Sequence, residues 1–163
     1  MGKKIESVRQ KSREGSDQFR KGAEAGQRAV SETKQNKKLI DSIPDDVDDE
    51  VKAAVKAVTD ATKSDAENYM KGEVSASIES GKKSMSDSSK EAGDQVKLNE
   101  RTQALFDQMD SVGSFGRNAR AAGRGSVEAS TREFNRAIQE NEKAALDAEA
   151  DHKRKLSEIS GTF

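Results

Sequence analysis

The sequence predicts an all-α fold, an elongated bundle or hairpin of three to four long helices in a single domain covering residues 1–163. Three observations support this prediction. Apolar and small residues recur at steps of three and four along most of the chain, which is the spacing of one helix face. No segment alternates apolar and polar residues as a strand would. The chain also has one proline, Pro44, so little interrupts its helices.

Bulky apolar residues are scarce, because Leu, Ile, Val and Phe together number 26 of 163. Charged residues make up 36% of the chain, and this polar composition leaves conditional disorder open. The net charge is only −1, however, so charge repulsion does not expand the chain. Regular helical spacing would also have no use in a coil. We therefore expect marginally stable helices whose helix content rises on binding.

A first helix is predicted at residues 3–41, with small residues on its apolar face as often as bulky ones. The face consists of Ile5, Val8, Ser12, Gly15, Phe19, Gly22, Gly26, Val30, Thr33, Lys37 and Ile40. Its glycines either let another helix approach closely or keep this helix loose until a partner arrives. Phe19 is a candidate partner-binding residue.

A second helix is predicted at residues 45–72, because Pro44 ends the first helix and favours a new start. The acidic run DDVDDE, residues 45–50, then lies in the first turns, where the helix dipole favours negative charge. An EF-hand calcium loop beginning at Asp46 would need a glycine and a glutamate where Val51 and Ala57 stand. The acids therefore indicate a helix start.

A third helix is predicted at residues 74–112, and its apolar face begins out of phase with that of the second. The face contains Met70, Val74, Ile78, Gly81, Met85, Ala92 and Val96, and a firmer part follows through Leu98, Leu105, Phe106 and Met109. Residues 75–90 include seven serines, which compete for backbone hydrogen bonds. We expect fraying or bending there, and whether residues 75–93 are helical or loose stays open.

A glycine turn at residues 113–116 and a last helix at residues 117–159 complete the chain. The last helix has the clearest seven-residue repeat, through Val127, Thr131, Phe134, Ile138, Asn141, Ala145, Ala148, His152, Leu156 and Ile159. Phe134 and Ile138 lie one turn apart on this face and are the strongest partner-binding candidates. The turn residues Gly113, Phe115 and Gly116 are further candidates, with a conformational role for the glycines.

Enzymatic chemistry finds little support in the sequence. Nucleophilic catalysis usually needs a histidine or cysteine base, and the chain has one histidine and no cysteine. Glu149 and His152 have the spacing of ligands in di-iron bundles, but no second histidine completes such a site. We therefore expect no enzyme, no metal and no cofactor.

Composition also argues against nucleic acid and membranes as partners. A local arginine band, formed by Arg117, Arg120, Arg124, Arg132 and Arg136, lies in a chain that is neutral overall and poor in aromatic residues. Helix faces of alanine, glycine and serine do not suit a membrane surface, and no apolar run is long enough to span one. The N-terminus lacks the apolar region of a signal peptide. This predicts a cytoplasmic protein or one exported without such a signal.

The region Asn99–Leu156, a helix, a glycine turn with one aromatic residue and a second amphipathic helix, resembles the WXG/LXG helical-hairpin superfamily of bacterial type VII secretion substrates and adaptors. Family members have Trp-x-Gly at this turn. This chain instead has Phe115 followed directly by Gly116, with Arg117 in place of the family glycine. The resemblance implies export motifs in which an acid follows an aromatic residue by four positions. Two pairs fit, Tyr69 with Glu73 and Phe106 with Asp110.

Three functional hypotheses follow from these observations. The first is a non-enzymatic interaction protein that pairs helix faces with another helical protein, as a partner, targeting factor or small substrate of type VII secretion. The second is a self-associating coiled-coil structural or scaffolding protein. The third is a conditionally disordered protective protein. They predict, in turn, a defined hetero-complex, a homo-oligomer and a mostly unfolded monomer.

Overall fold

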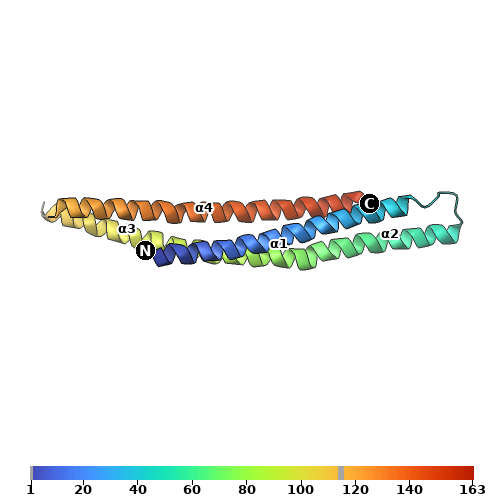
Figure 1. Ribbon diagram of the computed structural model, residues 1–163, viewed down its shortest axis with the longest axis horizontal. Helices are drawn as coiled ribbons and strands as arrows, with labels where there is room; N and C mark the ends of the chain where they lie inside the picture. The colour runs from blue at the N-terminus through green and yellow to red at the C-terminus, as the bar shows by residue number, and fades with distance from the viewer. Residues whose placement is uncertain (1, 114–115) are drawn as a thin grey trace. The chain divides into compact units, whose positions relative to one another are not determined.

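The computed structural model describes residues 2–113 and 116–163, and Figure 1 shows its four α-helices. In chain order these are α1 (Gly2–Asp41), α2 (Asp49–Tyr69), α3 (Ser75–Val112) and α4 (Arg117–Thr162), and the π-helical segment η1 (Met70–Val74) lies between α2 and α3. No strand occurs within the described ranges. The predicted all-α helical fold with three long helices is confirmed.

The chain divides into two compact units. Unit 1 consists of Met1–Gly15 and Lys82–Ala145, and unit 2 of Ser16–Gly81 and Leu146–Phe163. Helices α1, α3 and α4 each contribute residues to both units. Each unit has its own cluster of buried apolar side chains.

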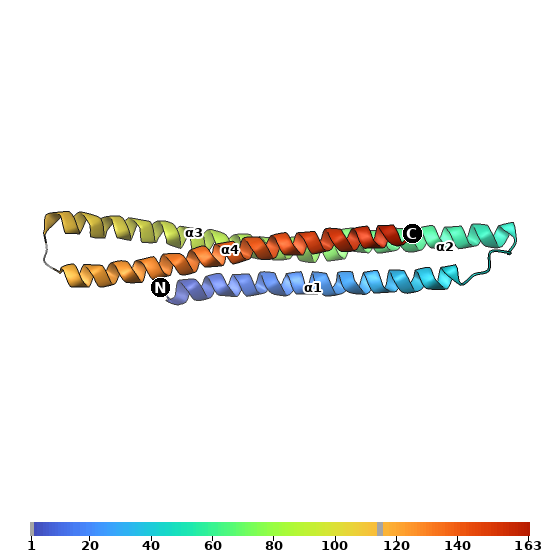
Figure 2. The same ribbon diagram turned by 90° about the horizontal axis from the view of Figure 1, so that it is seen from above.

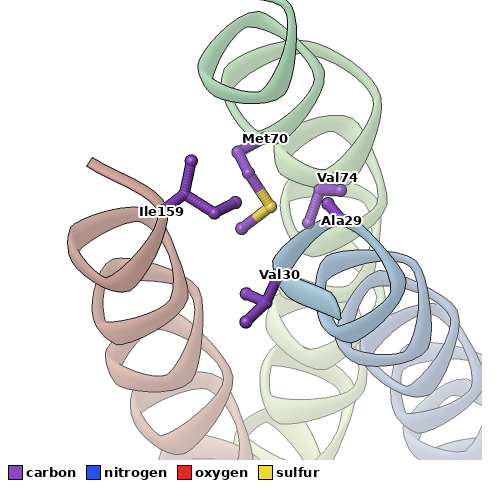
Figure 3. Packing of buried hydrophobic residues seen from close by; sticks show 5 residues of the cluster. All are labelled: Ala29, Val30, Met70, Val74 and Ile159. Carbon is purple, nitrogen blue, oxygen red and sulfur yellow. The ribbon is translucent and has the colours of Figure 1, made fainter. Parts of the chain in front are cut away.

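The core of unit 2 gathers apolar side chains around Met70. Figure 3 shows Met70 of η1 pointing between Ile159 of α4 and Val30 of α1, with Val74 and Ala29 beside it. Met70 and Ile159 are completely buried. A flexible thioether suits this irregular space, because methionine adapts its shape to the gap it fills.

Close helix packing in unit 2 explains the glycines of α1. A Cβ atom added at Gly22 would lie 2.8 Å from Cδ1 of Ile78, and one at Gly26 would lie 3.2 Å from Cδ of Lys155. The glycines therefore admit side chains from α3 and α4. Of the two predicted roles for this small-residue face, the structure supports close approach.

The core of unit 1 is smaller and centres on Phe134. Val8 of α1, Ala92 of α3 and Phe134 of α4 form it. Four partly buried side chains surround them, namely Ile5, Val96, Ala137 and Ile138. Phe134 is the largest fully buried side chain, with 2% of its surface exposed.

The start of α2 differs from the prediction, because the helix begins at Asp49 and not at residue 45. Asp48 is the N-cap, and its Oδ1 accepts a hydrogen bond of 2.9 Å from the backbone N–H of Val51. Figure 2 shows the connection of residues 42–48 that joins α1 to α2. Asp48, Asp49 and Glu50 therefore stabilise the first turn, whereas Asp45 and Asp46 precede the cap.

The serine-rich segment is also more regular than expected, because all of residues 75–90 lie in the α-helix α3. The backbone irregularity falls just before it, in the π-helical turn η1. A π turn holds more residues than an α turn, which explains why the apolar face shifts between Tyr69 and Met70. The serines do not fray the helix because some of them bond outside it: the hydroxyl of Ser88 donates to the carbonyl of Val8 over 2.8 Å.

Candidate interaction surface

Helices α3 and α4 form a hairpin in unit 1 whose register is fixed by three contacts. Nδ2 of Asn99 donates to the hydroxyl of Ser130 over 3.1 Å. The ring of Phe106 packs onto Gly123, where an added Cβ would lie 2.7 Å from Cζ. Nη2 of Arg124 donates to Oδ1 of Asp107 over 2.8 Å. The two helices are therefore antiparallel, with residue 105 level with residues 124–126.

Partly buried charge pairs close the hairpin near the turn. Nε of Arg120 donates to Oδ1 of Asp110 over 2.7 Å, and its Nη2 donates to the carbonyl of Gly113 over 2.8 Å. Arg124 also pairs with Asp110. The hydrogen bond from Arg120, assisted by Arg124, lowers the pKa of the Asp110 carboxyl below its ordinary value of 3.8. Gly116 has φ 75°, a left-handed conformation that favours glycine and allows α4 to begin at once.

The first turns of α1 lie against one side of this hairpin. Glu91 of α3 accepts hydrogen bonds from Nζ of Lys11 at 2.6 Å and from the hydroxyl of Ser7 at 3.0 Å. These bonds lower the pKa of Glu91, chiefly through Lys11, and the same ion pair raises the pKa of Lys11. On α4, Glu133 pairs with Arg9 of α1.

A buried polar layer joins α1 to both helices of the hairpin. Oδ1 of Asn141 accepts from the hydroxyl of Ser12 at 2.7 Å, and its Nδ2 donates to Ser88 at 3.0 Å and to Ser89 at 3.1 Å. Asn141 is 3% exposed. A single buried asparagine in a helical bundle specifies register, because any shift leaves its amide without partners.

Beyond α1, the same side of the hairpin is exposed and apolar. Leu98 and Leu105 follow Glu91 at steps of seven residues, and Met109 lies three such steps after Ser88. These three side chains are 50%, 59% and 51% exposed. A seven-residue step keeps a side chain on nearly the same side of a helix. They therefore continue the side of α3 that contacts α1.

The matching side of α4 contains only small residues. Ser126 and Ala119 precede Glu133 by seven and fourteen residues. Ala129 lies between Glu133 and Ser126, and Ala122 lies between Ser126 and Ala119. All four small residues are exposed. We define the hairpin face as Leu98, Leu105 and Met109 of α3 together with Ala119, Ala122, Ser126 and Ala129 of α4. The exposed Arg101 borders this face, three residues after Leu98.

The strongest predicted binding residues lie in the cores and not on this face. Phe134 is buried in unit 1, with Ile138 packed beside it, and Phe19 is 8% exposed. Gly113 is exposed and its carbonyl is bonded to Arg120, as described above, whereas Phe115 lies outside the described residues. Sequence reasoning missed the hairpin face as a surface.

The two predicted export motifs have different surroundings. Tyr69 packs partly buried against the core of unit 2, and Glu73 is exposed. Phe106 and Asp110 are both engaged within the hairpin, Phe106 on Gly123 and Asp110 with its two arginines. Asp110 is exposed as Glu73 is, but its carboxylate is already paired with two arginines.

Other kinds of site have no support in the described part of the chain. It has no group of three or more His, Asp or Glu side chains placed to hold a metal ion. None of its helices is both long and apolar enough to span a membrane. Comparison with protein families, with curated proteins and with solved structures finds no match to this chain.

Proposed function

We propose that the protein is a non-enzymatic helical interaction protein that binds through the hairpin face. The observation behind this proposal is the row of Leu98, Leu105 and Met109, each about half exposed, on the side of α3 that α1 covers a few turns earlier. Exposed leucines are common one at a time, but an apolar row beside small residues is typical of a contact surface.

The geometry of the face suits a helical partner. In unit 1, α1 already lies against the same side of α3 and α4, so a helix is the shape that this side accepts. The small side chains of α4 allow close approach, and the bulky ones of α3 provide apolar contact area. Recognition of this kind places anchors at steps of three, four and seven residues along the bound helix.

The finer part of the proposal is a role in bacterial type VII secretion, as a partner, targeting factor or small substrate. Its support is the resemblance of residues 99–156 to the family's helical hairpins and the exposed acid of the motif formed by Tyr69 and Glu73. Two ordered cores also favour an interaction protein over a conditionally disordered protective one.

An export assay tests the secretion role. The tagged chain is expressed in a bacterium with a type VII system and in the same strain without the ATPase of that system. We expect the protein in the medium of the first strain only, and less of it for Glu73→Gln. The control Glu100→Gln changes an exposed acid of α3 outside the motif and should be exported normally. Equal release from both strains would contradict the secretion role and leave binding through the hairpin face untouched.

A further inference from the structure

We infer that the hairpin face binds a second copy of this chain, in an antiparallel two-fold arrangement centred near Leu105. This inference rests on the proposed function because it uses the same face, and it names the occupant. The resulting contact would be a four-helix arrangement built from two α3–α4 hairpins, with α3 against α3 and α4 against α4.

The first argument is continuity with an existing interface. Where α1 is present in unit 1, the hairpin side is covered by a helix and bonded through Glu91 and Glu133. Under α1 this side of α3 includes the buried Ser88 and the half-buried Glu91, and farther along α3 it continues with Leu98, Leu105 and Met109, which are about half exposed. A helix side that stays in water is expected to keep polar residues, so a change to apolar residues at this point favours a contact surface.

The second argument is the symmetry of the two rows. In an isologous contact, residue i of one copy touches residue j of the other, and residue j touches residue i. Each row must therefore have similar residues on either side of its middle. The α3 row has large apolar residues on both sides of its middle near Leu105. The α4 row has small residues on both sides of its middle, between Ala122 and Ser126.

The register of the hairpin places these two middles at one level. Asn99 lies level with Ser130 and Phe106 with Gly123, so Leu105 lies level with residues 124–126. One two-fold axis can therefore pass through the middle of both rows. If the two middles lay at different levels, no single axis could pair both rows.

Sterics and charge select the antiparallel arrangement with a second copy. Two hairpins facing each other with their turns in the same direction would bring both α1 helices into one space, because α1 lies on the side that would form the contact. The antiparallel arrangement directs them away from each other. With a net charge of −1, two copies repel each other little.

The size of the face sets the expected strength. The rows extend over about a dozen residues, or roughly 18 Å at ~1.5 Å per residue, and are two helices wide. Such a face lies at the small end of specific interfaces, where association is weak and reversible. We therefore expect a monomer–dimer equilibrium that depends on protein concentration.

The test is sedimentation equilibrium of the full chain over a wide range of concentration. We expect the mass to rise from 17.7 kDa towards twice that value. Leu105→Glu and Leu105→Lys should each remain monomeric, because two like charges would meet at the axis. An equimolar mixture of the two variants should recover the dimer, since residue 105 of one copy lies opposite residue 105 of the other.

Two controls distinguish loss of the dimer from unfolding of the chain and from a general loss of exposed apolar surface. Leu105 is 59% exposed, so both variants should keep the helix content and melting temperature of the parent chain. Leu146→Glu changes a leucine of unit 2 that is 67% exposed, and it should leave the dimer intact.

Three outcomes would overturn the inference: a parent chain that is monomeric at every concentration, dimers that persist in both Leu105 variants, or a mixture that stays monomeric. A monomeric parent chain would leave the proposed function standing, because another helical protein could still occupy the face. Loss of export would affect the secretion role and not the dimer, so the two failures are distinguishable.

Discussion

Two helical hairpins, α1–α2 in unit 2 and α3–α4 in unit 1, differ in the residues on the side that no third helix covers. In unit 2, Glu158 of α4 pairs with Lys34 of α1 and Ser160 bonds to Glu67 of α2, and α1 and α2 both continue beyond these two contacts. The residues that continue this side are charged. They are Lys37 and Asp41 of α1 and Lys56, Asp60 and Lys63 of α2.

In unit 1 the hairpin face is lined by leucine, methionine and alanine, with the exposed Arg101 beside its α3 row. The exposed apolar residues of unit 2, such as Leu39 and Val58, lie on other sides of their helices, about 140° and 180° from the α4 contacts at 100° per residue. The two hairpins therefore have different residues on comparable sides. A charged side suits contact with water, and the contrast with the apolar hairpin face is the basis of the proposed interaction.

The largest effect should come from disrupting the core of unit 1, next to the hairpin face. Phe134→Ala creates a cavity in a small cluster and should lower the free energy of unfolding by about 3–5 kcal/mol. Urea denaturation followed by circular dichroism measures the loss. Arg136→Ala, an exposed control two residues away, should change stability by less than about 0.5 kcal/mol. Similar mild effects from both would mean that this side of α4 faces solvent.

A second prediction concerns the buried polar layer of unit 1, which contrasts with the apolar core of unit 2. Asn141→Ala leaves buried hydroxyls of Ser12 and Ser88 without their amide partner, which should cost about 1–3 kcal/mol. Asn141→Leu should recover stability while allowing other helix registers. Denaturation gives the first result, and loss of NMR chemical-shift dispersion gives the second. A stable, single-register Asn141→Leu variant would show that the layer has no role in specificity.

A feature of this structure could be predicted from the sequence where the spacing of apolar residues alone determines it. Every position named for the apolar faces of the first and last helices, from Ile5 to Ile40 and from Val127 to Ile159, is buried or partly buried. Helical period and residue size suffice for such faces. The start of α2 was wrong by four residues, because a proline was given more weight than the N-cap Asp48.

The hairpin face could not be predicted in the same way. Leu98, Leu105 and Met109 read as ordinary core residues, because spacing does not say which helix covers a given side. That answer depends on the pairing of α1 with α3, which contacts such as Lys11 with Glu91 reveal. The seven-residue step from Glu91 to Leu98 was the only signal in the sequence.

The turn should show a smaller and selective effect. Gly116→Ala forces alanine into a left-handed conformation and should cost about 1 kcal/mol. Gly113→Ala is the matched control, because φ is positive only at Gly116 among the described residues and an added Cβ at Gly113 meets no atom within 4 Å. Thermal melting of the two variants measures the difference. Equal melting temperatures would contradict the described turn.

The smallest effect concerns pH. The pKa of Asp110 is lowered in the folded chain by the bonds from Arg120 and Arg124, so its ionised form is favoured by folding. This stabilisation is fully present above the ordinary pKa of 3.8 and is lost as the pH falls through the lowered folded value. Melting temperatures of the parent chain and Asp110→Asn should therefore converge on acidification below about pH 4. A constant difference would mean that the ion pairs do not act in solution.

The most direct test of the contrast between the two hairpins is the rate at which a thiol on each reacts with a maleimide. The chain has no cysteine, so Ser126→Cys on the hairpin face and Asp60→Cys on the charged side of unit 2 each provide one reactive thiol. At low protein concentration both should react quickly. As the concentration rises, the rate for Ser126→Cys should fall while that for Asp60→Cys stays constant. Two rates that are both independent of concentration would contradict a face that is covered by a second copy.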